Sequence, residues 1–130
     1  MTFVAIEEVL LIGGPAGVGK SSVGWEVSVQ LNRLAVAHWH LEGDALDAAW
    51  PRPADDQDGQ RLTVNTLRAM ASVFSSEGYR RCVYVQTASV IDSGLVTQAL
   101  GKVHMTGVLA DGFGVDSVRT PLLSRARLRP

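Results

Sequence analysis

The chain has 130 residues, of which 46% are hydrophobic and 19% charged, and its formal net charge is −1. This size and apolar content suit one globular domain with its own core and exclude a chain disordered throughout. The nearly neutral charge argues against a nucleic-acid partner, and no apolar run is long enough to cross a membrane. Cys82 is the single cysteine and no signal-peptide pattern is visible, so we expect a cytoplasmic protein without disulfides.

The predicted elements alternate between strands and helices along residues 9–109. Apolar runs predict strands over residues 9–12, 35–41, 82–85 and 103–109. Apolar spacings of three and four predict helices over residues 20–34, over residues 60–77 and, capped by Asp92 or Ser93, as far as Gly101. This order implies parallel, right-handed connections. We therefore expect an α/β protein with a parallel sheet of four or five strands and helices on both faces.

Charge and periodicity both change near the end of the chain. Residues 1–116 carry 13 acidic and 8 basic side chains, a net of −5, whereas residues 117–130 carry four arginines and no acid, a net of +4. After Ala110 glycine and proline interrupt the sequence and no helical period remains. We accordingly predict one domain over residues 1–110 and an irregular basic tail over residues 111–130.

The most specific motif lies between the first strand and the first helix. Residues 14–21 match the pattern G-x-x-x-x-G-K-[ST], in which glycines let backbone N–H groups turn inward around phosphate oxygens. The helix start favours an anion, the Lys20 ammonium can reach the β and γ phosphates, and the Ser21 hydroxyl can bind Mg²⁺. The predicted nucleotide-binding residues are Gly14, Pro15, Ala16, Gly17, Val18, Gly19, Lys20, Ser21 and Ser22.

Two segments together resemble a known group of enzymes. Residues 9–23 resemble the opening of the P-loop NTPases, whose motif is called Walker A. The turn at residues 41–44, Leu-Glu-Gly-Asp, is similar to that of small-molecule kinases of the gluconate kinase, shikimate kinase, adenylylsulfate kinase and chloramphenicol phosphotransferase type. The resemblance covers residues 9–109. It implies Mg²⁺-dependent transfer of the γ-phosphoryl group of ATP to a small hydroxylated acceptor, with Lys20 and Asp44 as the catalytic residues.

Glu42 and Asp44 fall at the carboxyl end of the second predicted strand, where open parallel sheets bind their ligands. The resemblance implies that Asp44 orients the acceptor hydroxyl or accepts its proton. The alternative is that Asp44 only caps a short helix running through Ala48. For Glu42 the candidate role is to hold a water molecule bound to Mg²⁺.

The third predicted strand ends in Gln86 and Thr87, where a Walker B motif would place an aspartate. These two side chains either hold water or substrate or simply end the strand. Together with the missing lid described below, this departure favours an alternative function, a nucleotide-binding module or degenerate kinase fragment without its own catalysis. Residues 111–114 fit the D-x-x-G pattern of GTPases, but no guanine signature N-K-x-D is present, so we interpret that match as coincidence.

Five further side chains are candidates for a binding role or for a purely structural one. His38 and His40 share one face of the second predicted strand, either as part of a metal site or as satisfied strand histidines. Arg61 and Arg68 either clamp an anionic acceptor or form a solvated helix face. Cys82 opens a buried strand and is predicted to be inert.

The kinases of the resemblance continue past the fourth strand with an arginine-bearing lid helix and a fifth strand. Here the tail contains Arg119 and Arg125 but no helical period, so we assign no lid role to either residue. We interpret the tail as a truncated or altered C-terminal region, such as a change of reading frame would produce. A missing fifth strand would leave an open sheet edge, through which two copies could pair as a homodimer.

Overall fold

The structure is a computed structural model that describes residues 6–15, 19–87 and 93–110, and the statements below concern these residues. Its elements follow the predicted alternation of strands and helices. In chain order they are β1 (Glu8–Gly14), α1 (Lys20–Arg33), β2 (Trp39–Glu42), the 3-10 turns η1 (Gly43–Ala45) and η2 (Ala54–Asp56), α2 (Gln60–Ser76), β3 (Arg81–Thr87), α3 (Ser93–Leu100) and β4 (His104–Leu109). The predicted tail and the D-x-x-G match lie outside the described residues.

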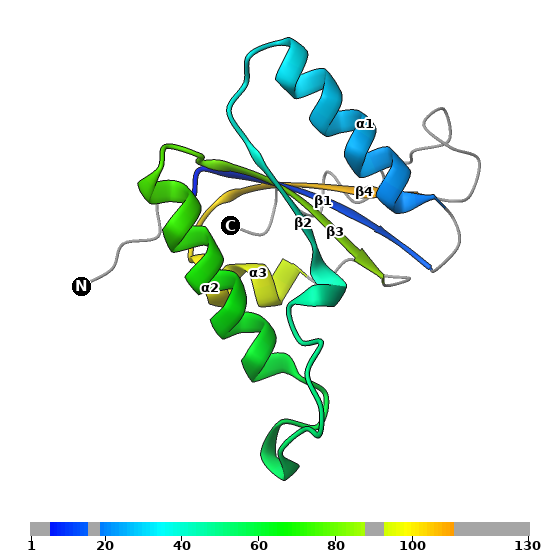
Figure 1. The fold of residues 1–130 in the computed structure, drawn as a ribbon, viewed down its shortest axis with the longest axis vertical. Helices are drawn as coiled ribbons and strands as arrows, with labels where there is room; N and C mark the ends of the chain where they lie inside the picture. The colour runs from blue at the N-terminus through cyan, green and yellow to red at the C-terminus, as the bar shows by residue number, and fades with distance from the viewer. Residues whose placement is uncertain (1–5, 16–18, 88–92, 111–130) are drawn as a thin grey trace.

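The four strands form one parallel sheet in the order β2-β3-β1-β4. β1 lies between β3 and β4, and its register against β3 runs from the pair Glu8 and Arg81 to the pair Gly14 and Thr87. Figure 1 shows α1 on one face of the sheet and α2 and α3 on the other. The predicted α/β class, with helices on both faces, is confirmed. β2 and β4 are the outer strands of the described sheet, and dimer formation through an open edge stays a prediction.

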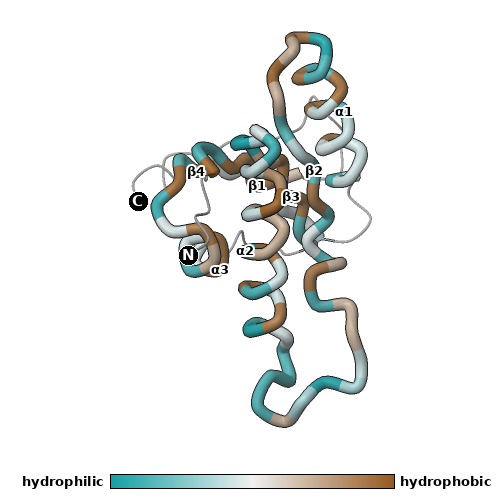
Figure 2. Tube along the Cα trace, turned by 60° about the vertical axis from the view of Figure 1, so that its left-hand side comes forward, coloured by the Kyte–Doolittle hydropathy of each residue, from teal (hydrophilic) through white to brown (hydrophobic). Residues whose placement is uncertain are grey.

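Two cores result from the alternation of side chains along the strands. On the side of α2 and α3 the largest contributions come from Val9, Leu11, Trp39, Leu41, Leu67, Tyr84, Val96 and Met105. On the side of α1 a smaller cluster forms from Ile12, Val23, Val83 and Val85. Figure 2 shows the corresponding hydrophobic colouring along β1 and β3. The strands are thus buried on both faces, as a parallel sheet between helices requires.

The predicted start of the second strand was wrong. Ala35 has a left-handed backbone conformation (φ 56°), and the N–H of Val36 donates to the carbonyl of Leu31 at 2.9 Å. These features close the end of α1, because a left-handed residue after a helix lets the following N–H groups reach back to its last carbonyls. β2 therefore begins at Trp39 and extends to Glu42.

β1 and β3 are both longer than their apolar runs. Their pairing continues to Gly14 and Thr87, and this brings the start of the phosphate-loop motif beside the end of β3. Among the described helices, none is long and apolar enough to cross a membrane.

Candidate functional site

The two ends of the phosphate-loop motif lie at the carboxyl edge of the sheet. β1 ends at Gly14 and α1 begins at Lys20, while Ala16, Gly17 and Val18 lie outside the described residues. Gly19 precedes the helix with a φ of +84°, and a Cβ built there would meet nothing within 4 Å. Glycine is therefore required for its backbone conformation and not for lack of space.

The first turn of α1 carries the predicted ligand groups. Ser21 and Ser22 are exposed and Lys20 is partly exposed. The turn contains no acidic residue, and among the described residues Lys20 has no ion-pair partner. The positive end of the helix and the ammonium group thus remain available to an anion.

A carboxylate from β2 reaches this turn. Glu42 is the last residue of β2, and the Ser21 hydroxyl donates to its Oε2 atom at 3.4 Å. Hydroxyl and carboxylate oxygens are the hard donors that Mg²⁺ prefers, so this pair fits the metal that the motif implies. Within the described ranges no group of three or more histidine, cysteine, aspartate or glutamate side chains could hold a metal ion. The remaining ligands would therefore be phosphate oxygens and water, as is usual for Mg²⁺.

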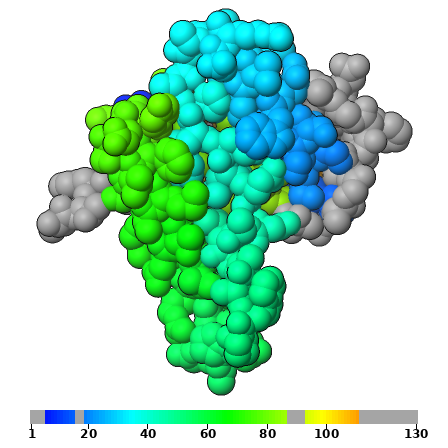
Figure 3. Space-filling model, viewed as in Figure 1, coloured from blue at the N-terminus to red at the C-terminus, as the bar shows by residue number. Residues whose placement is uncertain are grey.

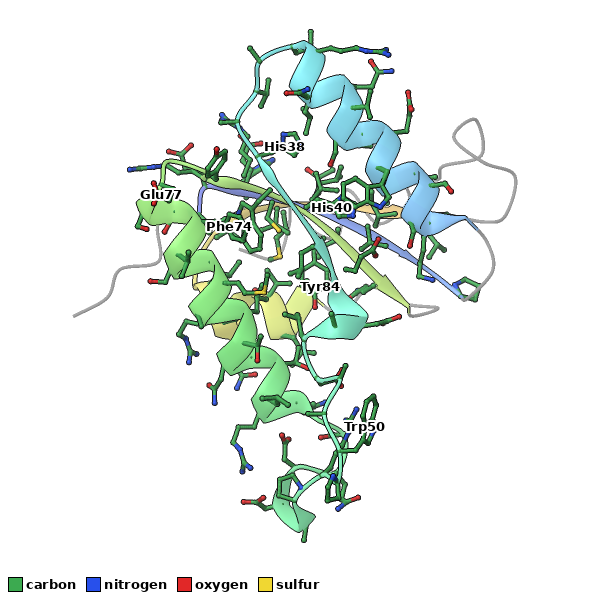
Figure 4. All side chains as sticks on the ribbon, in the orientation of Figure 1. His38, His40, Trp50, Phe74, Glu77 and Tyr84 are labelled. Carbon is green, nitrogen blue, oxygen red and sulfur yellow. The ribbon has the colours of Figure 1, made fainter. Side chains whose placement is uncertain are left out.

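Behind Glu42 lies His40, which faces α1 from the same strand. Its Nε2 atom is 3.3 Å from Oε1 of Glu42, and its Nδ1 atom is 3.2 Å from the hydroxyl oxygen of Ser28. The imidazole also stacks on Trp25, with ring centroids 3.8 Å apart and planes at 10°. Figure 4 shows His40 between β2 and α1.

The sequence reasoning missed Trp25 and Ser28. A usable signal was present, because Ser21, Trp25 and Ser28 are spaced by four and three and so share one helix face. His38 does not join this group. Its Nδ1 atom bonds the carbonyl of Val36 at 2.9 Å, so both histidines have hydrogen-bond partners within the protein, which favours the interpretation of satisfied strand histidines.

Asp44 lies in η1 at the same edge of the sheet and is exposed. The alternative, that Asp44 caps a short helix through Ala48, is wrong, because the turn comprises only Gly43–Ala45 and Glu42 occupies its capping position. A Cβ on Gly43 would lie 2.6 Å from a ring carbon of Tyr84 and 3.0 Å from the carbonyl oxygen of Val85. Glycine therefore lets η1 lie directly against β3, and this contact sets the position of Asp44.

β3 contributes one more polar group. Gln86 pairs in register with Gly13, and its buried Nε2 atom has no hydrogen-bond partner among the described residues. A buried donor without a partner costs free energy unless a ligand or water satisfies it. This favours the interpretation that Gln86 holds water or substrate over that of a satisfied strand end.

The two candidate arginines on α2 are already engaged. Arg61 binds the carboxylate of Asp55 through two nitrogens, at 2.9 and 3.2 Å, and this hydrogen-bonded guanidinium lowers the pKa of Asp55. Arg68 donates to the carbonyls of Gln98 and Ala99 at the end of α3, at 3.1 and 3.3 Å. Arg61 thus belongs to a solvated pair and Arg68 joins two helices, so the geometry does not favour the acceptor clamp.

Taken together, the parallel sheet order and the sequence motif between β1 and α1 are those of a P-loop α/β fold. No family model matches the sequence, and no curated protein matches it. Two solved structures of the Mycobacterium tuberculosis APS kinase CysC are similar to it, one of a cysteine-to-alanine mutant and one of the complex with AMPPNP and APS. Each is 20% identical, with TM-scores of 0.53 and 0.52, and the alignments cover 82% of this chain and 76% and 63% of the respective kinase chains. The resemblance to P-loop kinases is thereby confirmed at the level of the fold.

Proposed function

We propose that this chain binds ATP with Mg²⁺ and transfers the γ-phosphoryl group to a hydroxyl of a small-molecule acceptor. The observation that carries the proposal is the contact between Ser21 and Glu42, which joins the phosphate-loop motif to the acidic turn after β2. The kinase-type fold supports the same function.

In this function the start of α1 binds the triphosphate. Backbone N–H groups and the positive helix end would hold phosphate oxygens, and Lys20 would contact the β and γ phosphates. Ser21 and Glu42 would hold Mg²⁺, directly or through water, and the bound ion would supply neutralisation of phosphate charge.

The acceptor would bind beside η1. Asp44 would orient the acceptor hydroxyl and take its proton while the hydroxyl oxygen bonds to the γ-phosphorus and the bond to the ADP oxygen breaks. Proton transfer of this kind contributes about 10²–10⁴-fold to a rate. The Nε2 atom of Gln86, which has no partner among the described residues, would donate a hydrogen bond to the acceptor or to water.

Nucleotide binding without transfer is the second candidate function. The absence of a carboxylate from the end of β3, where Gln86 and Thr87 stand, favours it. The two candidates share the ATP site and differ only in the chemistry that follows binding.

Isothermal titration of the chain with ATP and Mg²⁺ tests the proposal. We expect binding that Lys20→Ala weakens at least about tenfold, because the variant loses a cation in contact with two phosphates. Lys102 is the only other lysine and is exposed beyond α3, so Lys102→Ala is the matched control and should bind as the unaltered chain does. Equal effects of both substitutions, or no binding by the folded chain, would contradict an ATP site at this loop.

A second experiment separates the two candidate functions. Radiolabelled ATP is incubated with a panel of small polyols, nucleosides and amino alcohols, and labelled products are separated from ATP. Acceptor-dependent label transfer supports the kinase, whereas ATP binding with no labelled product across the panel supports the binding module.

A further inference from the structure

We propose that His40 is a positioning residue for the Mg²⁺ site, because it holds the Glu42 carboxylate beside the Ser21 hydroxyl. The inference rests on the proposed function and deepens it. It assigns a role to a strand histidine, a tryptophan and a serine that the phosphate-loop motif does not include.

The chemistry of the groups determines which atoms donate and which accept hydrogen bonds at Glu42. A carboxylate only accepts, so the imidazole must carry its proton on Nε2 in order to donate to Oε1 of Glu42. Nδ1 and the Ser28 hydroxyl form a second hydrogen bond, in which the hydroxyl donates to a neutral imidazole and accepts from a protonated one. The second oxygen of Glu42 accepts from Ser21. Ser28, His40, Glu42 and Ser21 thus form one continuous chain of donors and acceptors from the interior of α1 to its first turn.

The imidazole itself has little freedom to move. Its side chain is 7% exposed, against 40% for Glu42, and one face of the ring lies on Trp25. Gly24 permits this close approach, since a Cβ there would lie 3.0 Å from Cε1 of His40 and 2.6 Å from a methyl carbon of Val85. A fixed donor therefore holds a long side chain that would otherwise sample several rotamers.

Within the described residues, His40 is also the only basic side chain that forms an ion pair or hydrogen bond with Glu42. In the described part of the chain, no lysine or arginine forms an ion pair with this carboxylate. Groups that orient a metal ligand in this way typically change metal affinity by 10–100-fold when they are removed. We therefore expect the effect of His40 in the Mg²⁺ dependence of ATP binding, not in ATP binding itself.

The test compares ATP affinity with Mg²⁺ and with a chelator present. His40→Phe keeps a ring against Trp25 but removes both hydrogen bonds, and we expect it to reduce the Mg²⁺-induced gain in ATP affinity about tenfold. Metal-free ATP affinity should not change. His40→Gln keeps an N–H donor and should restore most of the gain. His38→Phe is the matched control and should behave as the unaltered chain, because in the described structure the His38 imidazole hydrogen-bonds the Val36 carbonyl and not Glu42.

A double-mutant cycle shows whether His40 acts through Glu42. In a Glu42→Gln background, His40→Phe should cause no further loss of the Mg²⁺-induced gain, because the carboxylate it positions is gone. If His40→Phe does not fold, as judged by circular dichroism, Ser28→Ala replaces it and should reduce the same gain, since Nδ1 loses its hydrogen-bond partner.

Three results would overturn the inference. The first is that His40→Phe lowers ATP affinity equally with and without Mg²⁺. The second is that no variant reduces the Mg²⁺-induced gain in ATP affinity. The third is that the losses caused by His40→Phe and Glu42→Gln are additive in the double-mutant cycle. Failure of the proposed function is recognised separately, because the unaltered chain would then bind no ATP and the inference would fall with it.

Discussion

Two acidic residues separated by one glycine have different surroundings in this protein. Glu42 is bonded to His40 and to Ser21 and is partly buried, whereas Asp44 lies exposed in η1. A carboxylate tied to the phosphate-loop serine suits a metal site, and one exposed at the sheet edge suits contact with an incoming acceptor. The geometry thus supports a division of roles between them.

Asp44→Asn tests that division. The amide keeps the size of the side chain but cannot accept a proton, so we expect ATP affinity to stay the same and transfer to an identified acceptor to fall about 10²–10⁴-fold. Titration with ATP and a single-turnover assay measure the two quantities. A variant that loses ATP binding, or one that transfers at the normal rate, would remove Asp44 from the acceptor site.

Ala35 offers a stability prediction at the same scale. A left-handed conformation costs an L-residue roughly 1–2 kcal/mol, and glycine avoids this cost while losing about 0.4–1 kcal/mol through its freer unfolded state. Ala35→Gly should therefore raise the free energy of unfolding by about 0.5–1 kcal/mol in urea titrations. Ala37→Gly, at an exposed position without a positive φ, should lower it instead. The prediction fails if the two variants shift stability in the same direction.

The motif residues could be predicted from the sequence because their chemistry depends on local spacing. Gly19, Lys20 and Ser21 are consecutive, and the turn of Glu42 and Asp44 is equally local. The contacts of His40 could not be predicted, because Trp25 and Ser28 meet it only after α1 packs on β2 and β3. Side chains brought together by packing leave only a weak periodic signal in the sequence.

At the scale of whole elements, the apolar periods located all the helices and strands, and the errors lie at their ends. The second strand was predicted to begin at Ala35 because alanine, valine and a following apolar run fit a strand. Instead, the backbone N–H groups of Ala35 and Val36 donate to carbonyl groups at the end of α1. A helix cap of this kind depends on backbone conformation. When the left-handed residue is not a glycine, the amino-acid sequence does not show where the cap lies.

Arg68 adds hydrogen bonds to the apolar packing of α2 against α3. Arg68 donates to two carbonyls in the last turn of α3, where a cation also opposes the negative helix end. Arg68→Met keeps the apolar part of the side chain and should lower the free energy of unfolding by about 1 kcal/mol.

The matched control for this substitution is Arg61→Met on the same helix. Its partner Asp55 is exposed, so water replaces the lost contact and the destabilisation should be smaller. Urea unfolding of both variants gives the comparison, and ATP affinity should not change in either. A larger loss for Arg61→Met would show that the contacts to α3 do not contribute as we expect.

At the scale of the whole molecule, the sequence predicted parallel strands but not their order. The order β2-β3-β1-β4 places β1 in the interior, so Gly14, the first residue of the motif, lies beside the end of β3, and Ser21 lies near the end of β2. Figure 3 shows the residues before α2 and the first part of that helix projecting from the body of the protein. The acidic turn lies where this projection begins (Figure 1).

Because β3 lies in the interior of the sheet, we also expect the free energy of unfolding to change with pH in the alkaline range. Cys82 is 2% exposed within the core facing α2 and α3, and burial raises the pKa of its thiol far above the ordinary range. In the unfolded chain the thiol ionises near pH 8.5. A group whose pKa is raised by folding contributes stability below its unfolded pKa and loses it as pH rises, because only the unfolded state then releases the proton.

We therefore expect the free energy of unfolding to fall above about pH 8.5 with a slope that approaches 1.4 kcal/mol per pH unit from this one group. Cys82→Ala removes the ionisable thiol and leaves a small cavity, so it should lower stability at neutral pH but flatten the dependence between about pH 8.5 and 10. Urea titrations at a series of pH values measure both slopes. Parallel curves for the two proteins would mean that the thiol ionises in the folded state as readily as in the unfolded one, which burial in the central sheet should prevent.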